Sequence, residues 1–294
     1  MTLSPADLQA LVAVATAAAR RAGEHVAQAT PTGVEHKPGA PSPATAVVTD
    51  VDRESQAIIL ETLRPTLARF DLAVLAEEQP DDGARHEKPY FWCVDPLDGT
   101  LPFVESRPGY AVSVALVARD GAPLIGAVYD PVQRTLIHAA RGLGVFRDGQ
   151  PWAPRSQPAG DTLQLCTDAS FLAWRDYPRT LDGLRHIAAT LGLRGVTVQT
   201  GAAVMNACRV LGRPPACYFK FPKPQDGGGS LWDYAATACL FAEAGAAVSD
   251  ADGRPLELNR EGSTFMNHRG VVFASDRALA EAIRALRPDR PTPP

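Results

Sequence analysis

The chain has 294 residues, of which 45% are hydrophobic and 21% are charged, and its formal net charge is −4. This composition is typical of a soluble globular protein with a large core, in one domain or two subdomains. It shows no basic stripe for a nucleic-acid polymer, no secretory signal pattern and no apolar stretch of about 18 residues that would span a membrane, so we expect a cytoplasmic protein.

The sequence before residue 90 predicts two helices and one strand. In chain order we expect a helix over residues 4–29, a loop over 30–46, a helix that starts after 47–52 and extends to Phe70, a strand over 72–76 and a polar loop over 80–89. Ser4 gives the first helix an N-cap signature. Pro65 lies inside the second helix and removes a backbone donor, so a kink or break is expected near Arg64.

The middle of the chain predicts an antiparallel sheet. The expected strands cover residues 91–94, 110–117, 124–129, 135–140 and 144–146. The last four follow one another with short turns, as in a meander. This half is therefore expected to pack helices on an antiparallel sheet.

After residue 162 the pattern alternates between strands and helices, as in α/β proteins. The expected elements are strands over 163–166, 196–198, 216–219 and 271–274, and helices over 180–191, 203–211, 233–244 and 276–286. A loop rich in proline and glycine covers 221–230. We therefore expect an N-terminal α+β subdomain (1–155), a C-terminal α/β subdomain (156–286) that shares one cleft with it, and a disordered tail (287–294).

Neither the cysteines nor the histidines are spaced as metal ligands. The five cysteines are scattered, form no CxxC pair and mostly lie in apolar runs. They are therefore expected as reduced core thiols rather than as disulfides or zinc ligands. The six histidines are expected at surface or loop positions.

The segment from Trp92 to Thr100 carries the strongest chemical signal. An apolar strand ends in Asp95 and Asp98, which are separated by a proline and a leucine. Pro96 turns the chain, so both carboxylates and the Leu97 carbonyl can face one space. Hard oxygens of this kind suit Mg²⁺. If a helical turn starts at Gly99–Thr100, its N–H groups would form an anion site beside the cation.

Other carboxylates stand where helices begin or strands end. They are Asp52, Glu77, Glu78 and Asp233. Each has a simpler interpretation, as a helix cap or a solvated strand end. Together, however, converging carboxylates would repel one another unless cations lie between them.

These motifs resemble those of the inositol monophosphatase superfamily, the magnesium-dependent, lithium-sensitive phosphatases that include inositol monophosphatases and 3'(2'),5'-bisphosphate nucleotidases. Asp95-Pro96-Leu97-Asp98-Gly99-Thr100 is similar to the family signature, and Leu231-Trp232-Asp233 to its second signature. Segments 48–52 and 76–78 are similar to its other acidic motifs. The resemblance covers about residues 3–286 and implies a layered αβαβα sandwich.

The resemblance also implies roles for single residues. Glu77, Asp95 and the Leu97 carbonyl would hold one Mg²⁺, and Asp95, Asp98 and Asp233 a second. A third, weaker ion would join near Glu77 and Glu78, and Glu78 is placed with the catalytic residues.

Thr100 and Asp52 would orient and deprotonate the attacking water. The backbone N–H groups of Gly99 and Thr100 would hold phosphate oxygens. The substrate site would also include Gly201, Ala202, Ala203, Lys220 and Asp233.

Departures from the family pattern bear on the substrate. Leu101-Pro102 follows the signature where Thr-Asn is common, and Ala202 stands where a threonine is common. Lys220 replaces a frequent acidic residue, and Lys223 follows it in a loop with Gly227–Gly229. Two cations there would suit a second phosphate, or they are simply solvated.

The sequence therefore predicts a Mg²⁺-dependent phosphomonoesterase that acts on a small soluble ester, as a monomer or a homodimer. The first substrate hypothesis is a 3'(2'),5'-bisphosphorylated nucleoside. The second is inositol 1-monophosphate or another sugar phosphate. The alternative from another class is a non-catalytic binding protein on the same scaffold.

Overall fold

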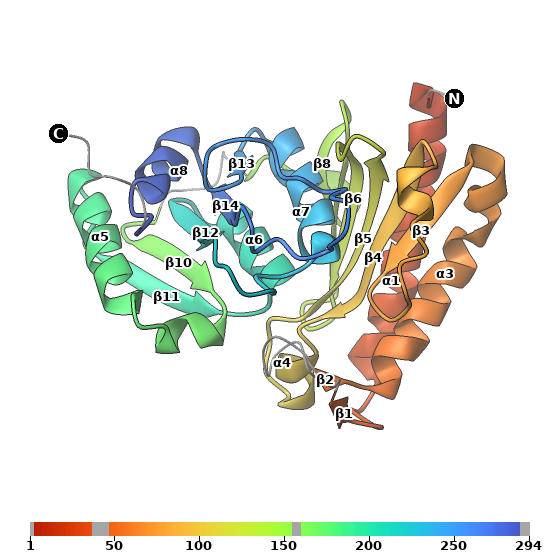
Figure 1. Ribbon diagram of the computed structural model, residues 1–294, viewed down its shortest axis with the longest axis horizontal. Coiled ribbons are helices and arrows are strands. Elements are labelled where there is room, and N and C mark those ends of the chain that lie inside the picture. Colours follow the sequence, from red (N-terminus) through yellow and green to blue (C-terminus); the bar gives the residue numbers. More distant parts are fainter. Residues whose placement is uncertain (1–2, 37–46, 155–159, 289–294) are drawn as a thin grey trace.

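Two large β-sheets, which helices separate and cover, make up most of the fold (Figure 1). The computed structural model describes residues 3–36, 47–154 and 160–288. The helices are α1 (Pro5–Gln28), α3 (Asp50–Phe70), α4 (Thr100–Val104), α5 (Tyr177–Thr190), α6 (Ala203–Gly212), α7 (Leu231–Ala244) and α8 (Arg277–Arg284), with 3₁₀ turns at Ala84–His86 and Ala169–Ala173.

The first sheet has seven strands in the order in which they follow along the chain. They are β3 (Leu72–Ala76), β4 (Tyr90–Asp98), β5 (Ala111–Ala118), β6 (Pro123–Asp130), β7 (Thr135–Ala140), β8 (Gly144–Arg147) and β9 (Gln150–Pro151). The pair β3–β4 is parallel, so both strands end at the same edge. The remaining neighbours are antiparallel, which confirms the predicted meander.

The second sheet has five strands in the order β11-β10-β12-β14-β13. They are β10 (Leu163–Thr167), β11 (Val196–Thr200), β12 (Ala216–Lys220), β13 (Ala247–Ser249) and β14 (Val271–Ala274). Strands β11, β10 and β12 are parallel, and β14 is antiparallel to its neighbours. The short strand β13 was not predicted, because three residues are too few to show an alternating pattern.

The layers alternate as the expected αβαβα sandwich requires. Helices α1 and α3 pack on the outer face of the first sheet, α6 and α7 lie between the sheets, and α5 and α8 cover the second sheet (Figure 1). Three clusters of buried apolar side chains fill the spaces between these layers. Gly126 on β6 is part of this packing, since a Cβ there would lie 2.2 Å from the Ala236 carbonyl oxygen of α7.

The two N-terminal helices begin with capping boxes that the sequence encodes locally. Ser4 caps α1 by accepting from the Asp7 N–H, while the Asp7 carboxylate accepts from the Ser4 N–H at 3.0 Å. Thr49 and Asp52 form the same box at α3. Each box supplies acceptors to N–H groups that the first helical turn leaves unpaired.

Three local predictions were wrong. Helix α3 begins at Asp50 rather than after residue 52, because Thr49 is its cap. It also continues through Pro65 without a break, whereas a kink or break was expected near Arg64. Strand β4 does not stop at Val94 but runs to Asp98, because Asp95 and Asp98 still pair with β5.

Some expected features lie outside the described residues. These are residues 37–46 of the first loop, the subdomain boundary at 155–156 and residues 289–294 of the tail. A short strand pair, β1 (Glu35–His36) with β2 (Val47–Val48), flanks the first of these segments. The five cysteines are buried and free, as predicted. No helix of the described part of the chain is long and apolar enough to cross a membrane.

Candidate active site

A β-bulge at the end of β4 brings Asp95 and Asp98 to the same side of the strand. Asp95 pairs with Ser113 and Asp98 with Ala111, so the three-residue step on β4 matches a two-residue step on β5. Without the extra residue, positions three apart would point to opposite faces of the sheet. The Asp95 carboxylate accepts from the Leu97 N–H at 3.0 Å, which fixes this turn.

Asp233 completes a cluster of three carboxylates. One oxygen from each of Asp95, Asp98 and Asp233 lies within 4.8 Å of the other two. Asp233 stands in the first turn of α7 and accepts from the Ser230 N–H at 3.0 Å, as the partner of Ser230 in a capping box. The sequence had placed these three residues together as metal ligands.

Burial makes this cluster hard to ionise when no cation is present. Asp95 is 1% exposed and Asp98 is 7% exposed. Desolvation, and then the charges of neighbouring carboxylates, raise the pKa of Asp95 and that of Asp98 well above their usual range. Desolvation also raises the pKa of Asp233 to about 6, although Lys220 opposes this shift.

Glu77 and Glu78 follow β3, which ends beside β4 because the two strands are parallel. The Glu77 N–H donates to the Val94 carbonyl at 3.2 Å. The charge of Glu77 contributes to the raised pKa of Asp95. The Glu78 N–H donates to Gln56 Oε1 at 2.9 Å, so Glu78 is held against α3.

Asp52 and Thr100 are in direct contact. The Thr100 hydroxyl donates to Asp52 Oδ1 at 2.8 Å. The other oxygen, Oδ2, accepts from the Thr49 N–H at 2.8 Å. Desolvation raises the pKa of Asp52, whereas its bonds from Thr49 and Thr100 lower it, and the net shift is upward.

The turn at Gly99 connects the two halves of the site. Gly99 has φ +92°, a left-handed conformation that favours glycine, and α4 begins at Thr100. A Cβ on Gly99 would lie 2.7 Å from the Ala202 Cβ. The Gly99–Thr100 turn predicted from the sequence is therefore present. It packs against Ala202, in the loop that follows β11 of the second sheet.

The segment Gly201–Ala203 lies beside the aspartate cluster. The Ala202 N–H donates to the Gly109 carbonyl at 2.8 Å. The Val204 N–H, in the first turn of α6, donates to Asp98 Oδ2 at 2.8 Å. The start of α6 thus orients the Asp98 carboxylate, although the two lie 106 residues apart in the sequence.

Lys220 has a partner that sequence reasoning missed. Its ammonium lies 2.6 Å from Asp168 Oδ2, and Asp168 Oδ1 accepts from Asn206 Nδ2 at 3.3 Å. Burial lowers the pKa of Lys220, but the charge of Asp168 outweighs this and the pKa is raised. A useful signal was available, because Asp168 comes two residues after the strand expected over 163–166, and side chains just beyond the carboxyl ends of strands in α/β folds often bind ligands.

The residues of this site fit a hard divalent cation. All the side-chain ligand atoms of the cluster are carboxylate oxygens. The Leu97 carbonyl oxygen lies 3.4 Å from the Thr100 hydroxyl oxygen. Neither a cysteine nor a histidine belongs to the cluster found among the described residues. A divalent cation bound among these carboxylates would stabilise their charged forms and so lower their pKa values.

Comparison with known proteins identifies the family. The model of the inositol monophosphatase family matches residues 7–291. An inositol-1-monophosphatase from Synechocystis is 32% identical over 264 residues, which are 87% of this chain and 84% of the relative. A Vibrio cholerae protein called Nus factor SuhB is 29% identical and covers 93% of this chain and 94% of its own length.

Solved structures agree with the fold. An inositol monophosphatase from Anabaena is 26% identical, with a TM-score of 0.68, and covers 95% of this chain and 96% of its own. The suhB protein of Bartonella henselae has a TM-score of 0.71 at 23% identity and covers 96% and 100%, which supports the fold alone. Members of the family hydrolyse phosphate monoesters and depend on metal ions, in general Mg²⁺. This chain belongs to the inositol monophosphatase family and is a phosphatase.

Proposed function

We propose that the chain hydrolyses a small phosphate monoester at a Mg²⁺ centre formed by Glu77, the Leu97 carbonyl and the Asp95–Asp98–Asp233 cluster. The observation that carries this proposal is the cluster itself, with three carboxylate oxygens within 4.8 Å of one another in a buried place. Bound Mg²⁺ would supply positive charge that activates water and stabilises the leaving oxygen. Two or three ions fit the number of carboxylates.

Asp52 and Thr100 are proposed to prepare the attacking water. The hydroxyl of Thr100 donates its proton to Asp52, so its lone pairs are free to accept a proton from water. As Thr100 accepts the proton of the water, its own hydroxyl proton passes to Asp52, whose raised pKa makes it a better proton acceptor than an exposed aspartate. Glu78, which lies beyond the end of β3, is proposed to assist in preparing the attacking water.

The phosphate is proposed to lie against the start of α4. The backbone N–H groups of Gly99 and Thr100 stand at the first turn of this helix, which favours negative charge. Gly201, Ala202 and Ala203 face the same turn from the second sheet, as the close approach of Ala202 to Gly99 supports. The alcohol part of the substrate would then extend toward Lys220 and Asp233.

The favoured substrate is a polyol monophosphate such as an inositol phosphate. The Lys220–Asp168 ion pair supports this choice, because it offers both a donor and an acceptor to hydroxyl groups while carrying no net charge. The relative named inositol-1-monophosphatase, at 32% identity, points the same way.

A 3'(2'),5'-bisphosphorylated nucleoside is the second candidate. Lys220 is the observation that favours it, since a second phosphate would require a cation on the leaving-group side. Such a phosphate would have to displace Asp168 from Lys220, which makes this candidate the weaker one.

A phosphate-release assay with Mg²⁺ tests both candidates. The substrates are inositol 1-phosphate, 3'-phosphoadenosine 5'-phosphate and fructose 1,6-bisphosphate. We expect the highest kcat/KM with inositol 1-phosphate. A higher value with the bisphosphorylated nucleoside would reverse the order of the two candidates, and no release with any phosphate ester would contradict the enzymatic proposal.

A further inference from the structure

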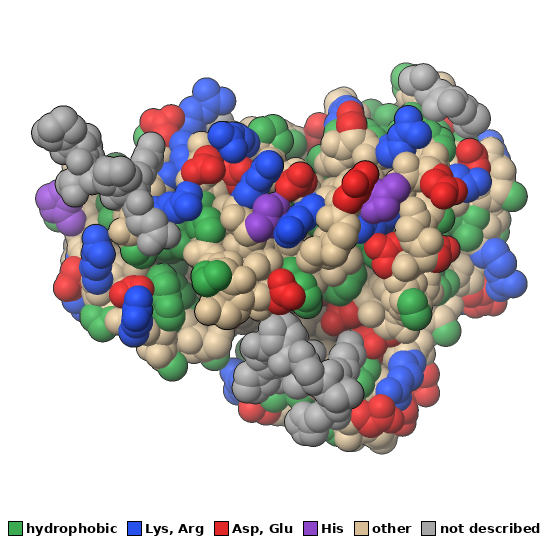
Figure 2. All heavy atoms as spheres, viewed as in Figure 1, with side chains coloured by type: hydrophobic (Ala, Val, Ile, Leu, Met, Phe, Trp, Pro, Cys, Tyr) green, Lys and Arg blue, Asp and Glu red, His purple; other side chains and the backbone are tan. Residues whose placement is uncertain are grey.

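Charge on the surface does not mark where a phosphate ester enters. On the face seen in Figure 2, acidic and basic side chains of the described residues are intermixed. What fixes the substrate therefore lies inside the candidate site, where two turns meet. They are the Gly99–Thr100 turn at the end of β4 and the Gly201–Ala203 turn after β11.

A third backbone segment, residues 109–110, joins these two turns. A Cβ on Gly99 would lie 2.7 Å from the Ala202 Cβ and 3.2 Å from the Tyr110 Cα. A Cβ on Gly109 would lie 3.0 Å from the Gly201 Cα. The Ala202 N–H also donates to the Gly109 carbonyl at 2.8 Å. The distance between the two turns is therefore set where residues 109–110 and 201–202 meet.

Two side chains of α6 hold the start of the second turn. Arg209 Nη1 donates to the Thr200 carbonyl at 2.9 Å. Asn206 lies three positions earlier, on the same face of α6, and its Nδ2 donates to the Gly201 carbonyl at 2.8 Å. Two successive carbonyls are thus fixed by the helix that follows the turn. The bond from Arg209 is charge-assisted, and such bonds are stronger than those between neutral groups.

The glycine at position 201 leaves room for the Arg209 guanidinium. A Cβ on Gly201 would lie 2.3 Å from Arg209 Nη1. Gly201 is not among the residues with positive φ, so the space that Arg209 fills, rather than the backbone conformation, excludes a side chain there. On the other side, a Cβ on Gly109 would lie 3.2 Å from Arg209 Nη2. Arg209 therefore lies against both of the segments that the Ala202–Gly109 hydrogen bond joins.

We propose that Arg209 is a positioning residue for the substrate. It holds the Gly201–Ala203 turn against residues 109–110 and so fixes the position of this turn relative to the Gly99–Thr100 turn. This inference rests on the proposed function, which places the phosphate ester between the two turns. Arg209 acts through the backbone and does not itself contact the substrate.

The loss of Arg209 should change KM rather than kcat. The metal cluster and the water-preparing pair are held by other contacts, from the Val204 N–H to Asp98 and from Thr100 to Asp52. Arg209 takes part in neither contact. A displaced turn therefore weakens binding of the substrate and of the transition state alike, which raises KM and leaves kcat nearly unchanged.

Steady-state phosphate release at saturating Mg²⁺, with the ester that gives the highest kcat/KM, measures this effect. Arg209→Met keeps the length of the side chain but removes its donors, and it should raise KM about tenfold with kcat within about twofold. The Mg²⁺ concentration for half-maximal activity should not change. Arg209→Lys restores a cationic donor and should recover part of the KM.

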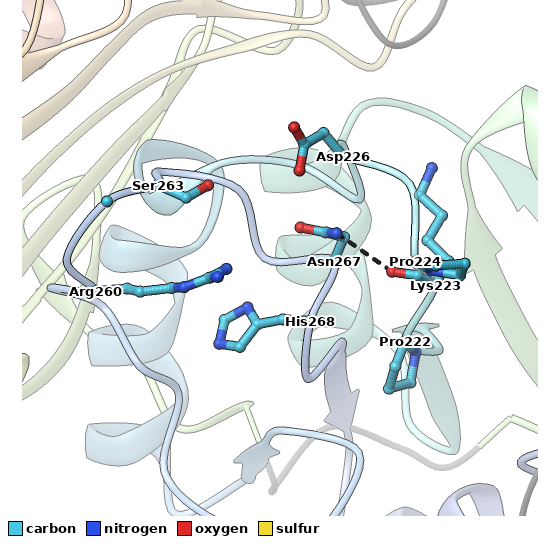
Figure 3. A pocket seen from close by; sticks show the side chains of 9 residues that line it. Pro222, Lys223, Pro224, Asp226, Arg260, Ser263, Asn267 and His268 are labelled. Atoms are coloured by element: carbon cyan, nitrogen blue, oxygen red, sulfur yellow. Dashed lines mark hydrogen bonds between the residues drawn. The ribbon is translucent and has the colours of Figure 1, made fainter.

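Arg260→Met is the matched control. Arg260 is half-buried, as Arg209 is, and its side chain extends into a cavity between residues 222–226 and 260–268 (Figure 3). The lining of this cavity includes no residue of the Gly201–Ala203 turn. KM and kcat of Arg260→Met should equal those of the wild type.

Gly201→Ala tests the same contact from the other side. The added Cβ would displace the Arg209 guanidinium, so KM should rise as it does in Arg209→Met. Because both substitutions remove one contact, the double variant should show no larger increase than the greater of the two single variants. Fully additive effects would overturn the Arg209–Gly201 contact as the cause.

Hydrogen exchange of the metal-free protein, followed by mass spectrometry, tests the positioning without catalysis. The segments around Gly109 and Ala202 should exchange faster in Arg209→Met than in the wild type or in Arg260→Met. The proposal fails if Arg209→Met, shown by thermal melting to be folded, keeps the wild-type KM or the wild-type exchange. A fall in kcat at unchanged KM also overturns it. If the wild type hydrolyses no ester, the proposed function fails, and the exchange rates alone decide whether Arg209 holds the turn.

Discussion

Thr100 and Asp52, which are 48 residues apart in sequence, form a 2.8 Å hydrogen bond between the start of α4 and the first turn of α3. Both side chains are buried, at 8% and 1% exposure. The same aspartate caps α3 through Thr49. A residue that looks like a simple helix cap in sequence thus also orients a hydroxyl at the candidate active site.

Replacing Thr100 with valine should reduce kcat by about 10²–10⁴-fold with a smaller change in KM, because the variant keeps the shape but cannot relay a proton. Steady-state phosphate release measures both constants. Thr100→Ser retains the hydroxyl and should keep most of the activity. A Thr100→Val enzyme with normal kcat would show that the Thr100–Asp52 pair does not prepare the water.

Asp98→Asn should abolish turnover and stabilise the metal-free protein. The amide oxygen can still accept from the Val204 N–H, while the charge that Asp95 and Asp233 repel is removed. We expect activity to fall about a thousandfold or more and the metal-free Tm to rise by a few degrees. Differential scanning calorimetry with and without Mg²⁺ measures the second effect.

Asp182→Asn is the matched control, since this carboxylate is 72% exposed on α5. It should leave both activity and Tm unchanged. Turnover at the wild-type level in Asp98→Asn would refute the assignment of Asp98 as a metal ligand.

The stability of the metal-free protein should depend on pH through the carboxylate cluster. The folded-state pKa of Asp233, about 6, is above its unfolded value of 3.8. Its contribution to the free energy of unfolding is therefore complete below about pH 3.8 and is lost as pH rises through 6. The loss is of the order of 1–3 kcal/mol for this residue, and Asp95 and Asp98 add to it in the same direction.

Urea unfolding in EDTA between pH 4 and 8 measures this loss. Saturating Mg²⁺ should compensate it, so that the stabilisation by Mg²⁺ grows with pH. A metal-free protein that becomes more stable between pH 4 and 7 would contradict the raised pKa values as the cause.

Gly229→Ala should weaken Mg²⁺ binding and lower activity. The added Cβ would lie 2.5 Å from Asp233 Oδ2 and 2.3 Å from the Tyr234 hydroxyl, so the carboxylate must move. Gly149→Ala is a control for backbone strain, because its φ of +79° is close to the +84° of Gly229 and a Cβ there meets nothing within 4 Å. The Mg²⁺ concentration that gives half-maximal activity should rise only in Gly229→Ala. If the two substitutions have equal effects, backbone strain explains the result and the clash with Asp233 does not.

Asp168→Asn should change substrate preference. The variant leaves the charge of Lys220 without its partner, so kcat/KM for 3'-phosphoadenosine 5'-phosphate should rise relative to that for inositol 1-phosphate. Lys220→Met should shift the ratio in the opposite direction. If both variants lose activity equally toward the two substrates, the Lys220–Asp168 pair has only a structural role.

Much of the site was predictable because its motifs are local. The Asp95–Thr100 segment carries two carboxylates, a carbonyl and a hydroxyl within six residues, and the capping box at Asp233 needs only Ser230 three positions earlier. Long periodic elements such as α1 and the β5–β8 meander were predicted because their apolar patterns are also local properties of the sequence. One error arose where pairing with a neighbouring strand overrides the local signal, as at the end of β4. Another arose where a helix accommodates a proline, as α3 does at Pro65.

The sequence by itself determined which chemistry is available, because the residue types of a metal centre and their order along the chain are local properties. Only the tertiary structure decided which groups meet. The bulge in β4 turned Asp98 to the side of Asp95, the start of α6 supplied the Val204 N–H, and two adjacent parallel strands brought Asp168 to Lys220. These pairings join residues from 13 positions apart, as in Asp98 and Ala111, to 106 positions apart, as in Asp98 and Val204. They depend on how strands and helices pack, which the pattern of neighbouring residues does not specify.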